Sequence, residues 1–298
     1  MNWRSILKVE PTTLFIRGKR VCYLDIGPEK GRPIFYFHGT PSSRIEVQLF
    51  INHAKTLNVR VIACDRPGYG TSDFNTNWTF LEWANVIKEI ADHLDINKFG
   101  ILGYSGGGAA ALACSIQFSE RITFLGLLCA FAPVGTYQAS SQLNRVDRFF
   151  ANIARKFPST LKVAFLPISV LFKRFPNLMI EILKLCVSVS DREMLDNENF
   201  ARVLIDSQQE AFSNGTTGAA REALLQYTDW GFNLSDVNNT VDMWFGTHDV
   251  FVDCLMSKHI MSNLKQVSTY TLNGKGHFHL DVFEEILKIF VNKHDRNG

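Results

Sequence analysis

Hydrophobic residues follow strand-like and helix-like patterns in alternation along the first part of the chain. Apolar runs predict strands at Thr13–Arg17, Arg20–Ile26, Pro33–Phe37, Val59–Cys64, Phe99–Leu102 and Ile122–Phe131. Helical spacing predicts helices at Ser42–Thr56, Phe80–Leu94 and Gly107–Phe118. Gly18-Lys19, between the first two strands, predicts a hairpin. Because strands alternate with helices, we expect a mostly parallel sheet with helices on its faces.

The alternation stops between about Gly135 and Tyr227 and then resumes. Within this span the spacing predicts helices at Phe149–Phe157, Leu161–Phe172, Leu178–Val189 and Phe200–Phe212, broken by Pro158, Pro167 and Pro176. After it, the pattern predicts strands at Val241–Phe245 and Val267–Leu272 and helices at Ser257–Leu264 and Phe278–Asn292. We therefore predict an α/β core made of residues 1–134 and 228–298, with an all-helical cap inserted at 135–227.

Charges are segregated within the predicted cap. The stretch from Arg145 to Arg174 is mostly basic and interleaved with Phe, whereas the stretch from Glu181 to Glu210 is mostly acidic. The simpler interpretation is a solvated helical lid whose two parts attract each other. Basic, Phe-rich helices are also typical of contact with a lipid interface, which stays open as an alternative.

Composition narrows the classes of function. The 298 residues are 46% hydrophobic and 20% charged, which is typical of a folded globular protein. The net charge of +2 gives no general attraction to nucleic acid. The N-terminus lacks the apolar stretch of a signal peptide, and the longest apolar run, Phe124 to Val134, is too short to span a bilayer, so we expect no integral membrane segment. The six cysteines form no C-x-x-C pair, which predicts free buried thiols and a cytoplasmic location.

The strongest chemical signal is a serine between a predicted strand and a predicted helix. Ser105 is the centre of Gly103-Tyr104-Ser105-Gly106-Gly107. A serine at such a turn has a strained backbone that exposes its hydroxyl, and small residues must flank it to avoid the neighbouring strand and helix. A helix-capping serine in a tight turn is the alternative interpretation. The apolar strand before the motif and the Ala-rich helix after it favour a catalytic nucleophile.

A serine hydroxyl needs a base to become a good nucleophile. His277 follows the last predicted strand, in Gly274-Lys275-Gly276-His277-Phe278, where the glycines allow the loop to reach back over the sheet. His279, expected inside the start of the next helix, is the nearest rival.

The base in turn needs a carboxylate that orients it. Asp249 directly follows the predicted strand Val241–Phe245, at the sheet edge where catalytic groups collect in open α/β folds. Asp253 is the alternative acid. The order Ser105, Asp249, His277 predicts a nucleophile–acid–base triad.

Acyl transfer also needs backbone N–H groups that bind an oxyanion. Gly106, directly after the nucleophile, is expected to donate one of them. The second is expected from Thr40 in His38-Gly39-Thr40-Pro41, because Pro41 has no N–H and Gly39 is expected to make the bend. A plain turn is the alternative for this second segment.

These motifs resemble the α/β-hydrolase superfamily, in the capped branch that includes esterases, cofactor-free perhydrolases and C–C bond hydrolases. The matching segments are His38-Gly39-Thr40-Pro41, Asp65 to Ser72, Gly103 to Gly107, Gly246-Thr247-His248-Asp249, Gly276-His277-Phe278 and Asp229-Trp230-Gly231-Phe232. The resemblance implies Ser–His–Asp chemistry that needs no metal or cofactor, and it implies that Asp65 to Ser72 shapes the oxyanion turn. Relatives often have a proline shortly after the acid, whereas this chain has Val250-Phe251-Val252-Asp253. This departure keeps Asp253 open.

The leading hypothesis is a hydrolase that cleaves a carboxylic ester, thioester or similar acyl bond of a small apolar substrate. A serine in the turn argues against haloalkane dehalogenases and epoxide hydrolases, whose relatives have Asp there. C–C bond hydrolysis and perhydrolysis on the same triad stay alternatives, as does a ligand-binding sensor that retains the fold. Peptidase activity on a free N-terminus would need a cap carboxylate near the pocket, for which the sequence offers Glu193, Glu198 and Glu210. The sequence indicates neither the specific substrate nor the oligomeric state.

Overall fold

The computed structural model describes residues 10–135, 143–279 and 282–297. Within these ranges one sheet contains β1 (Thr12–Ile16), β2 (Lys19–Ile26), β3 (Arg32–Phe37), β4 (Val59–Cys64), β5 (Phe99–Tyr104), β6 (Ile122–Leu128), β7 (Val241–Gly246) and β8 (Val267–Leu272). The strand order is β1-β2-β4-β3-β5-β6-β7-β8. β2 pairs antiparallel with β1 and β4, and the other pairs are parallel. The predicted hairpin and the mostly parallel sheet are confirmed.

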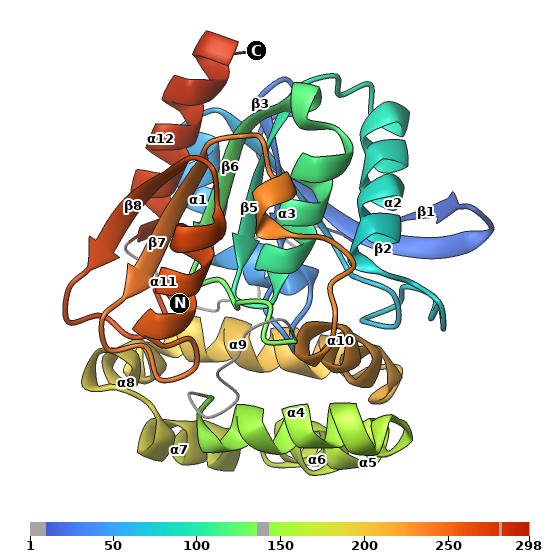
Figure 1. The fold of residues 1–298 in the computed structure, drawn as a ribbon, viewed down its shortest axis with the longest axis vertical. Helices are drawn as coiled ribbons and strands as arrows, with labels where there is room; N and C mark the ends of the chain where they lie inside the picture. The colour runs from blue at the N-terminus through green and yellow to red at the C-terminus, as the bar shows by residue number, and fades with distance from the viewer. Residues whose placement is uncertain (1–9, 136–142, 280–281, 298) are drawn as a thin grey trace.

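Helices cover both faces of the sheet (Figure 1). α1 (Ile51–Thr56) and α12 (Val282–Asn297) pack on one face, and α2 (Phe80–His93), α3 (Gly107–Gln117) and α11 (Cys254–Asn263) cover the other. Short 3-10 helices are η2 (Arg44–Phe50), η3 (Ser119–Arg121) and η5 (Leu234–Asp236). The central strands are buried on both faces, and all seven residues of β6 are buried. Such strands are continuous apolar runs rather than alternating patterns.

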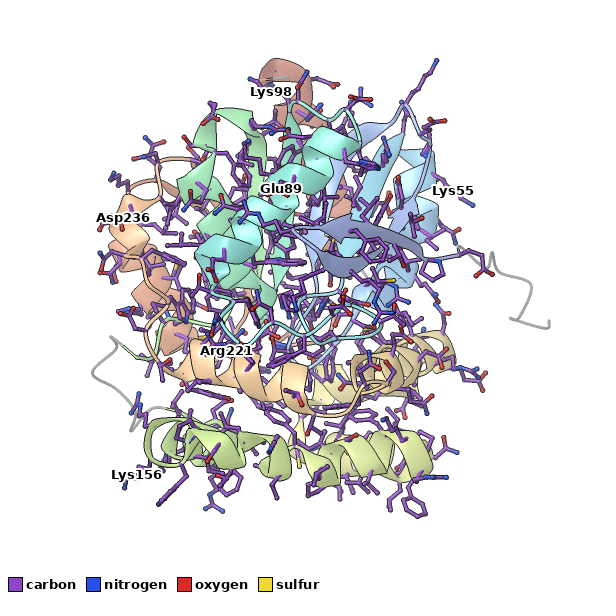
Figure 2. All side chains as sticks on the ribbon, turned by 90° about the vertical axis from the view of Figure 1, so that its right-hand side faces the viewer. Lys55, Glu89, Lys98, Lys156, Arg221 and Asp236 are labelled. Atoms are coloured by element: carbon purple, nitrogen blue, oxygen red, sulfur yellow. The ribbon has the colours of Figure 1, made fainter. Side chains whose placement is uncertain are left out.

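The remaining helices form what we call the helical layer, residues 145–227. It contains α4 (Arg145–Lys156), η4 (Pro158–Thr160), α5 (Leu161–Ala164), α6 (Leu166–Arg174), α7 (Pro176–Cys186), α8 (Val189–Asp196), α9 (Glu198–Ala211) and α10 (Thr217–Tyr227). α8, α9 and α10 lie next to one end of the sheet, and α4 to α7 form an outer tier farther from it (Figure 1). Figure 2 shows the same two tiers from the side, with Lys156 at the opposite end of the molecule from Lys98. The layer occupies the span predicted as a cap, and its assignment as a separate domain stays a prediction.

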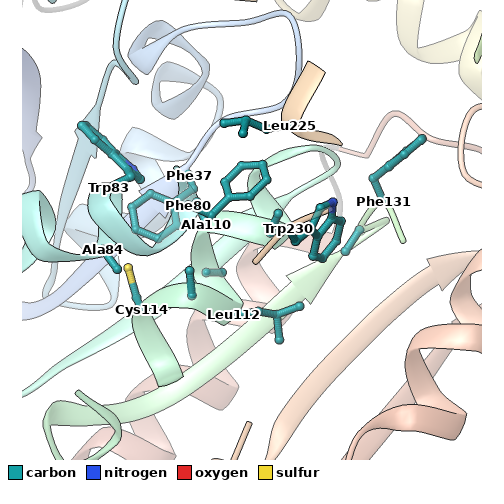
Figure 3. Packing of buried hydrophobic residues seen from close by; sticks show 14 of the residues in the cluster. Phe37, Phe80, Trp83, Ala84, Ala110, Leu112, Cys114, Phe131, Leu225 and Trp230 are labelled. Atoms are coloured by element: carbon teal, nitrogen blue, oxygen red, sulfur yellow. The ribbon is translucent and has the colours of Figure 1, made fainter. Parts of the chain in front are cut away.

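Buried side chains join the helical layer to the sheet core. Leu225 of α10 belongs to the same buried cluster as Phe37 of β3 (Figure 3). Fully burying a Leu or Phe side chain contributes about 1.5–3 kcal/mol. The layer is therefore held on the sheet by packing along its inner helices and not only by the chain connections.

The structure corrects the predicted helices in three places. The predicted helix Ser42–Thr56 is α-helical only from Ile51, because Arg44–Phe50 is a 3-10 helix. The predicted helix Leu161–Phe172 is divided into α5 and α6. The last helix begins at Val282 and not at Phe278.

Two helices of the layer are not predicted by the hydrophobic pattern. α8 is mostly polar and α10 is rich in small residues, so neither has a clear apolar stripe. Pro158 and Pro176 stand at helix starts, where a missing N–H costs nothing, so each separates two helices as predicted and begins the second one.

The cysteines largely follow the prediction. The six are free, and Cys22, Cys64, Cys114 and Cys129 are buried. Cys186 is exposed and Cys254 is half-buried, so the prediction of buried thiols is wrong for these two. Residues 1–9, 136–142, 280–281 and 298, which belong to the predicted core and cap ranges, lie outside the described residues.

Candidate active site

Ser105 lies in the turn between β5 and α3, as predicted. Its φ angle is +51°, in the left-handed region that residues other than glycine rarely adopt. The Ser105 N–H donates to the carbonyl oxygen of Leu128 at 2.9 Å, and the Ser105 carbonyl accepts from the N–H of Phe131 at 3.1 Å. The end of β6 and the loop after it therefore hold the strained turn in place.

The glycines of the motif are required by close contacts. A Cβ on Gly103 would lie 2.8 Å from the carbonyl oxygen of Gly107. A Cβ on Gly107 would collide with the carbonyl oxygen of Phe37, and one on Gly106 with Oγ1 of Thr40. Strand, turn and helix meet too closely here for any side chain, as the sequence predicted.

His277 and Asp249 are directly hydrogen-bonded. Nδ1 of His277 lies 2.7 Å from Oδ2 of Asp249, and both side chains are buried. Oδ1 of Asp249 accepts from the backbone N–H groups of Phe251 at 2.9 Å and Val252 at 2.8 Å, so both carboxylate oxygens are fixed. His277 and Ser105 line the same cavity. The structure thus brings the three residues of the predicted triad to one edge of the sheet.

The pKa of His277 depends on two opposing effects. Burial lowers the pKa, but the charge of Asp249 and its hydrogen bond outweigh burial and raise the pKa above its ordinary value of 6.5. A raised pKa makes the neutral ring a stronger base, which suits proton abstraction from a serine hydroxyl.

Asp253 and His279, the alternative acid and the alternative base, have different surroundings from Asp249 and His277. Oδ1 of Asp253 accepts from the N–H groups of Leu255 at 2.7 Å and Met256 at 3.1 Å, so Asp253 caps the start of α11. His279 lines the cavity but precedes α12, which begins at Val282, so its expected position inside a helix was wrong. The geometry therefore favours Asp249 as the partner of His277.

The turn after β3 lies close to Ser105. A Cβ on Gly39 would lie 3.6 Å from Cβ of Ser105, and Thr40 lines the cavity beside Gly106. Within the described residues, the N–H groups of Thr40 and Gly106 donate to no protein acceptor. Two free N–H groups beside a nucleophile are the arrangement that an oxyanion requires.

Arg66 fixes the shape of this turn. Its fully buried guanidinium donates to the carbonyl oxygens of His38 at 2.8 Å and Gly39 at 2.9 Å, and to Oγ1 of Thr40 at 3.2 Å. Arg66, within the segment Asp65 to Ser72, thus contacts the turn after β3, and the role of this turn in binding an oxyanion stays a prediction.

These groups share a cavity of about 480 Å³. Ser105, Gly106, Thr40 and His277 line it from the sheet edge. The walls formed by the helical layer are apolar and include Phe150, Phe165, Phe172, Met179, Leu183 and Val203. Among the described residues that line it, there is no Lys or Arg. Apolar walls with a few convergent polar groups are typical of a small-molecule site.

A family model described as the alpha/beta hydrolase fold matches residues 32–283. The chain belongs to this family. A haloalkane dehalogenase of Psychrobacter cryohalolentis is 28% identical over 137 residues, covering 45% of each chain. The 2-hydroxy-6-oxononadienedioate/2-hydroxy-6-oxononatrienedioate hydrolase 1 of Pseudomonas putida is 28% identical over 242 residues, covering 78% of this chain and 77% of the relative.

The structural similarity to a solved structure extends over nearly the whole chain. A bromoperoxidase from Bacillus anthracis has a TM-score of 0.71 at 18% identity, covering 95% of this chain and 100% of the other. At this identity the likeness shows the fold. By sequence, the chain spans less than half the length of the first curated relatives that it matches.

In this member of the α/β-hydrolase family, α10 supplies polar contacts beside Ser105 that the hydrophobic pattern does not predict. Oε1 of Glu222 lies 2.5 Å from Nε of Arg66, and both side chains are fully buried. Nε2 of Gln226 donates to the carbonyl oxygen of Gly106 at 2.8 Å and to Oγ1 of Thr40 at 3.3 Å. Glu222 and Gln226 are four residues apart and share one helix face. Two polar residues on one face of an Ala-rich segment are the signal that would have revealed them.

Helix α8 holds the loop that contains His277. The buried carboxylate of Asp191 accepts from the N–H groups of His277 at 3.0 Å and Phe278 at 2.7 Å. Oγ of Ser190 accepts from the N–H of Gly276 at 2.8 Å, and a Cβ on Gly276 would collide with Asp191. No local pattern links this helix start to a loop so distant in sequence, so sequence reasoning misses Asp191. The helical layer therefore contributes to the position of the histidine.

Asp147 of α4 brings a carboxyl group from the helical layer to the cavity. The hydroxyl of Tyr227 donates to its Oδ1 at 2.6 Å, and Nδ2 of Asn144 donates to its Oδ2 at 2.6 Å. Burial raises the pKa of Asp147 to about 6, although these hydrogen bonds oppose the shift. The cap carboxylates proposed from the sequence are not among the described cavity residues: Glu193, Glu198 and Glu210.

Cys129 lies beside the triad. Its Sγ and ligand atoms of Asp249 and His277 lie within 4.8 Å of one another, close enough to surround a metal ion. Burial and then the charge of Asp249 raise the pKa of the Cys129 thiol well above its ordinary value. A metal ligand has to be a thiolate, and Nδ1 of His277 is already bonded to Asp249. These groups therefore suit acyl transfer better than metal binding.

Proposed function

We propose that this protein hydrolyses carboxylic esters or similar acyl bonds of small, apolar, uncharged substrates. The main support is the hydrogen bond between His277 and Asp249 at the cavity that Ser105 also lines. In such an arrangement the carboxylate fixes the tautomer of the ring and stabilises the imidazolium that forms when the ring takes the serine proton.

The proposed reaction has two stages. Oγ of Ser105 attacks the acyl carbon while its proton passes to Nε2 of His277. The N–H groups of Thr40 and Gly106 stabilise the oxyanion, and losing one such donor typically costs about 100- to 1,000-fold in rate. The bond to the leaving alcohol breaks as His277 returns the proton to it. Water then attacks the acyl-enzyme, with His277 again taking the proton, which releases the acid and restores Ser105.

Hydrolysis of a C–C bond is the second candidate, because the Pseudomonas putida relative is named as a hydrolase of dioates. Two carboxylates on a substrate require cationic partners, and no Lys or Arg lines the described part of the cavity. Asp147 and Glu46 line it instead. Two carboxyl groups in the cavity wall favour an uncharged acyl substrate over a dicarboxylate. The resemblance implies Asp at this turn in dehalogenases, whereas this chain has Ser105, so dehalogenation is not proposed.

Covalent labelling tests the nucleophile. A fluorophosphonate probe should label the wild type and the matched surface variant Ser262→Ala, but not Ser105→Ala. Equal labelling of wild type and Ser105→Ala would refute the proposed nucleophile. If neither is labelled while a long-chain ester still binds tightly, the protein is a sensor that retains the fold.

A substrate panel then separates the reactions. We expect turnover of p-nitrophenyl esters and thioesters, persisting in EDTA because the proposed chemistry uses no metal. Cleavage of a dioate C–C substrate with no ester turnover would favour the second candidate instead.

A further inference from the structure

The outer tier of the helical layer, α4 to α7, exposes an unusual number of apolar side chains. Fourteen large hydrophobic side chains are exposed among the described residues, and eleven of these lie between Val146 and Val189. Phe157 is 63% exposed and Leu185 is 83% exposed. Single exposed apolar residues are normal, but a concentration in one part of the surface marks an interaction site.

Helices α6 and α7 are apolar on both faces. Phe172 and Met179 are buried at the cavity, whereas Val170 and Leu178 on the same helices are about half exposed. A helix that is apolar all round is normally buried all round. The inner face of this tier is covered by the rest of the molecule, whereas the outer face is covered by none of the described residues.

The shape of this tier suits a position along a membrane surface. No single helix in the described part of the chain is long and apolar enough to cross a bilayer. The pair Pro158–Arg174 and Pro176–Cys186 has the apolar character of a membrane segment but is bent by 119°. Helices bent in this way fit the plane of the interface better than a path across it.

The charge of the same tier indicates its partner. Residues 145–186 are all described, and seven cations among them are exposed: Arg145, Arg148, Arg155, Lys156, Lys162, Lys173 and Arg174. Within residues 145–186, Glu181 is the only exposed carboxylate, and its Oε1 lies 2.9 Å from Nζ of Lys184. In the rest of the chain acidic residues outnumber basic ones. Figure 2 shows Lys156 at the outer end of the tier, far from the sheet.

We propose that the exposed face of α4 to α7 docks on an anionic lipid surface. The apolar side chains would enter the boundary between headgroups and acyl chains, and the cations would contact the anionic headgroups. A second copy of the chain is a poorer partner, because pairing two such faces would bring two sets of cations together.

The cavity opens at this same tier. Val146, Ile182 and Cys186 line the cavity and are exposed, so the cavity reaches the outside between α4 and α7. Docking places this opening against lipid, which suits acyl substrates that dissolve poorly in water. This consequence rests on the proposed function, whereas the docking itself does not.

Vesicle co-sedimentation of the full chain tests the proposal. We expect binding to vesicles of phosphatidylcholine with phosphatidylserine at low salt, and much weaker binding to phosphatidylcholine alone or at high salt. Lys173→Gln with Arg174→Gln should weaken binding about 25-fold, at about fivefold for each charge near the surface. The control Lys30→Gln with Lys55→Gln removes two exposed charges elsewhere and should leave binding unchanged.

Two matched double variants test how much the exposed apolar side chains contribute to vesicle binding. Phe149→Gln with Leu185→Gln, which do not line the cavity, should weaken binding more than tenfold, whereas Phe15→Gln with Leu255→Gln should not. The proposal fails if anionic vesicles do not bind the wild type, or if the control pairs weaken binding equally. It also fails if light scattering shows a dimer that the Phe149/Leu185 variant dissociates. Fluorophosphonate labelling of the same samples reports on Ser105 separately, so failed docking and failed chemistry are distinguishable.

Discussion

The sheet edge and the helical layer enclose the same cavity but hold their shapes in different ways. At the sheet edge, Asp249 and Arg66 are fixed by several hydrogen bonds each, and Gly103 and Gly107 leave no room for a side chain. The helical layer meets the cavity mainly with apolar side chains. Hydrogen bonds and close contacts demand particular residues, whereas apolar packing tolerates many combinations of similar volume. Under the proposed function, the edge therefore determines the reaction, and the layer determines which substrate fits.

The contrast between the polar sheet edge and the apolar helical layer has an exception. The layer also supplies Asp191, Glu222 and Gln226, which contact the loop of His277, the side chain of Arg66 and the carbonyl oxygen of Gly106. Under the proposed function, the layer is thus part of the catalytic framework as well as a cover. Four predictions test this division, from the largest expected effect to the smallest.

Removing the charge of Asp249 should have the largest effect. We expect Asp249→Asn to lower kcat/KM about 10,000-fold, because an amide cannot hold the ring tautomer or stabilise the imidazolium. Steady-state kinetics with a p-nitrophenyl ester measures this loss. Asp253→Asn is the matched control and should stay close to wild type, because Asn also caps helices well. The opposite result would make Asp253 the catalytic acid.

Asp191→Asn should have an intermediate effect, although Asp191 touches no substrate. We expect kcat/KM to fall about 10- to 100-fold, because the loop of His277 loses a charged acceptor that holds two N–H groups. After the larger effects of burial and Asp249, the charge of Asp191 also raises the pKa of His277. His277 acts as a base only when neutral, so activity is lost as the pH falls below this pKa. In Asp191→Asn that loss should move to lower pH.

A pH profile of kcat/KM distinguishes positioning from folding in this case. Asp196→Asn, on the same helix but at the surface, should change neither the rate nor the profile. If Asp191→Asn lowers the rate without moving the profile, Asp191 has only a structural role.

The same contrast explains what the sequence predicts and what it does not. Ser105, Asp249 and His277 follow strand ends directly, so their positions depend on short-range patterns and on the order of strands. Asp191 and Glu222 act across the boundary between the layer and the sheet, on partners that are distant in sequence. Their helices, α8 and α10, lack an apolar stripe, so the pattern that predicts the other helices does not find them. Asp147 lines the cavity because of the way α4 packs, and residue spacing alone does not determine that packing.

The walls formed by the layer should control substrate length. Leu183 lines the cavity, whereas Leu185, two residues later on α7, is 83% exposed and does not. Leu183→Trp should lower kcat/KM for a long-chain ester about tenfold and leave an acetyl ester nearly unchanged, because added volume excludes only the longer chain. Leu185→Trp should leave both unchanged in the absence of lipid. A panel of p-nitrophenyl esters checks this, and equal loss for both esters would instead indicate a disturbed catalytic edge.

The smallest expected effect comes from the one carboxyl group that the layer brings to the cavity. With a pKa of about 6, Asp147 is charged in alkaline solution and neutral in acid. A charge in an apolar cavity retains water and opposes binding of an acyl chain. In a Ser105→Ala background, Asp147→Asn should therefore tighten binding of a long-chain ester about threefold about two pH units above this pKa, and change nothing two units below it. Calorimetry at the two pH values measures the difference. Weaker binding in Asp147→Asn at the higher pH would mean that the carboxylate attracts a cationic group of the substrate, and the layer would then select charge as well as length.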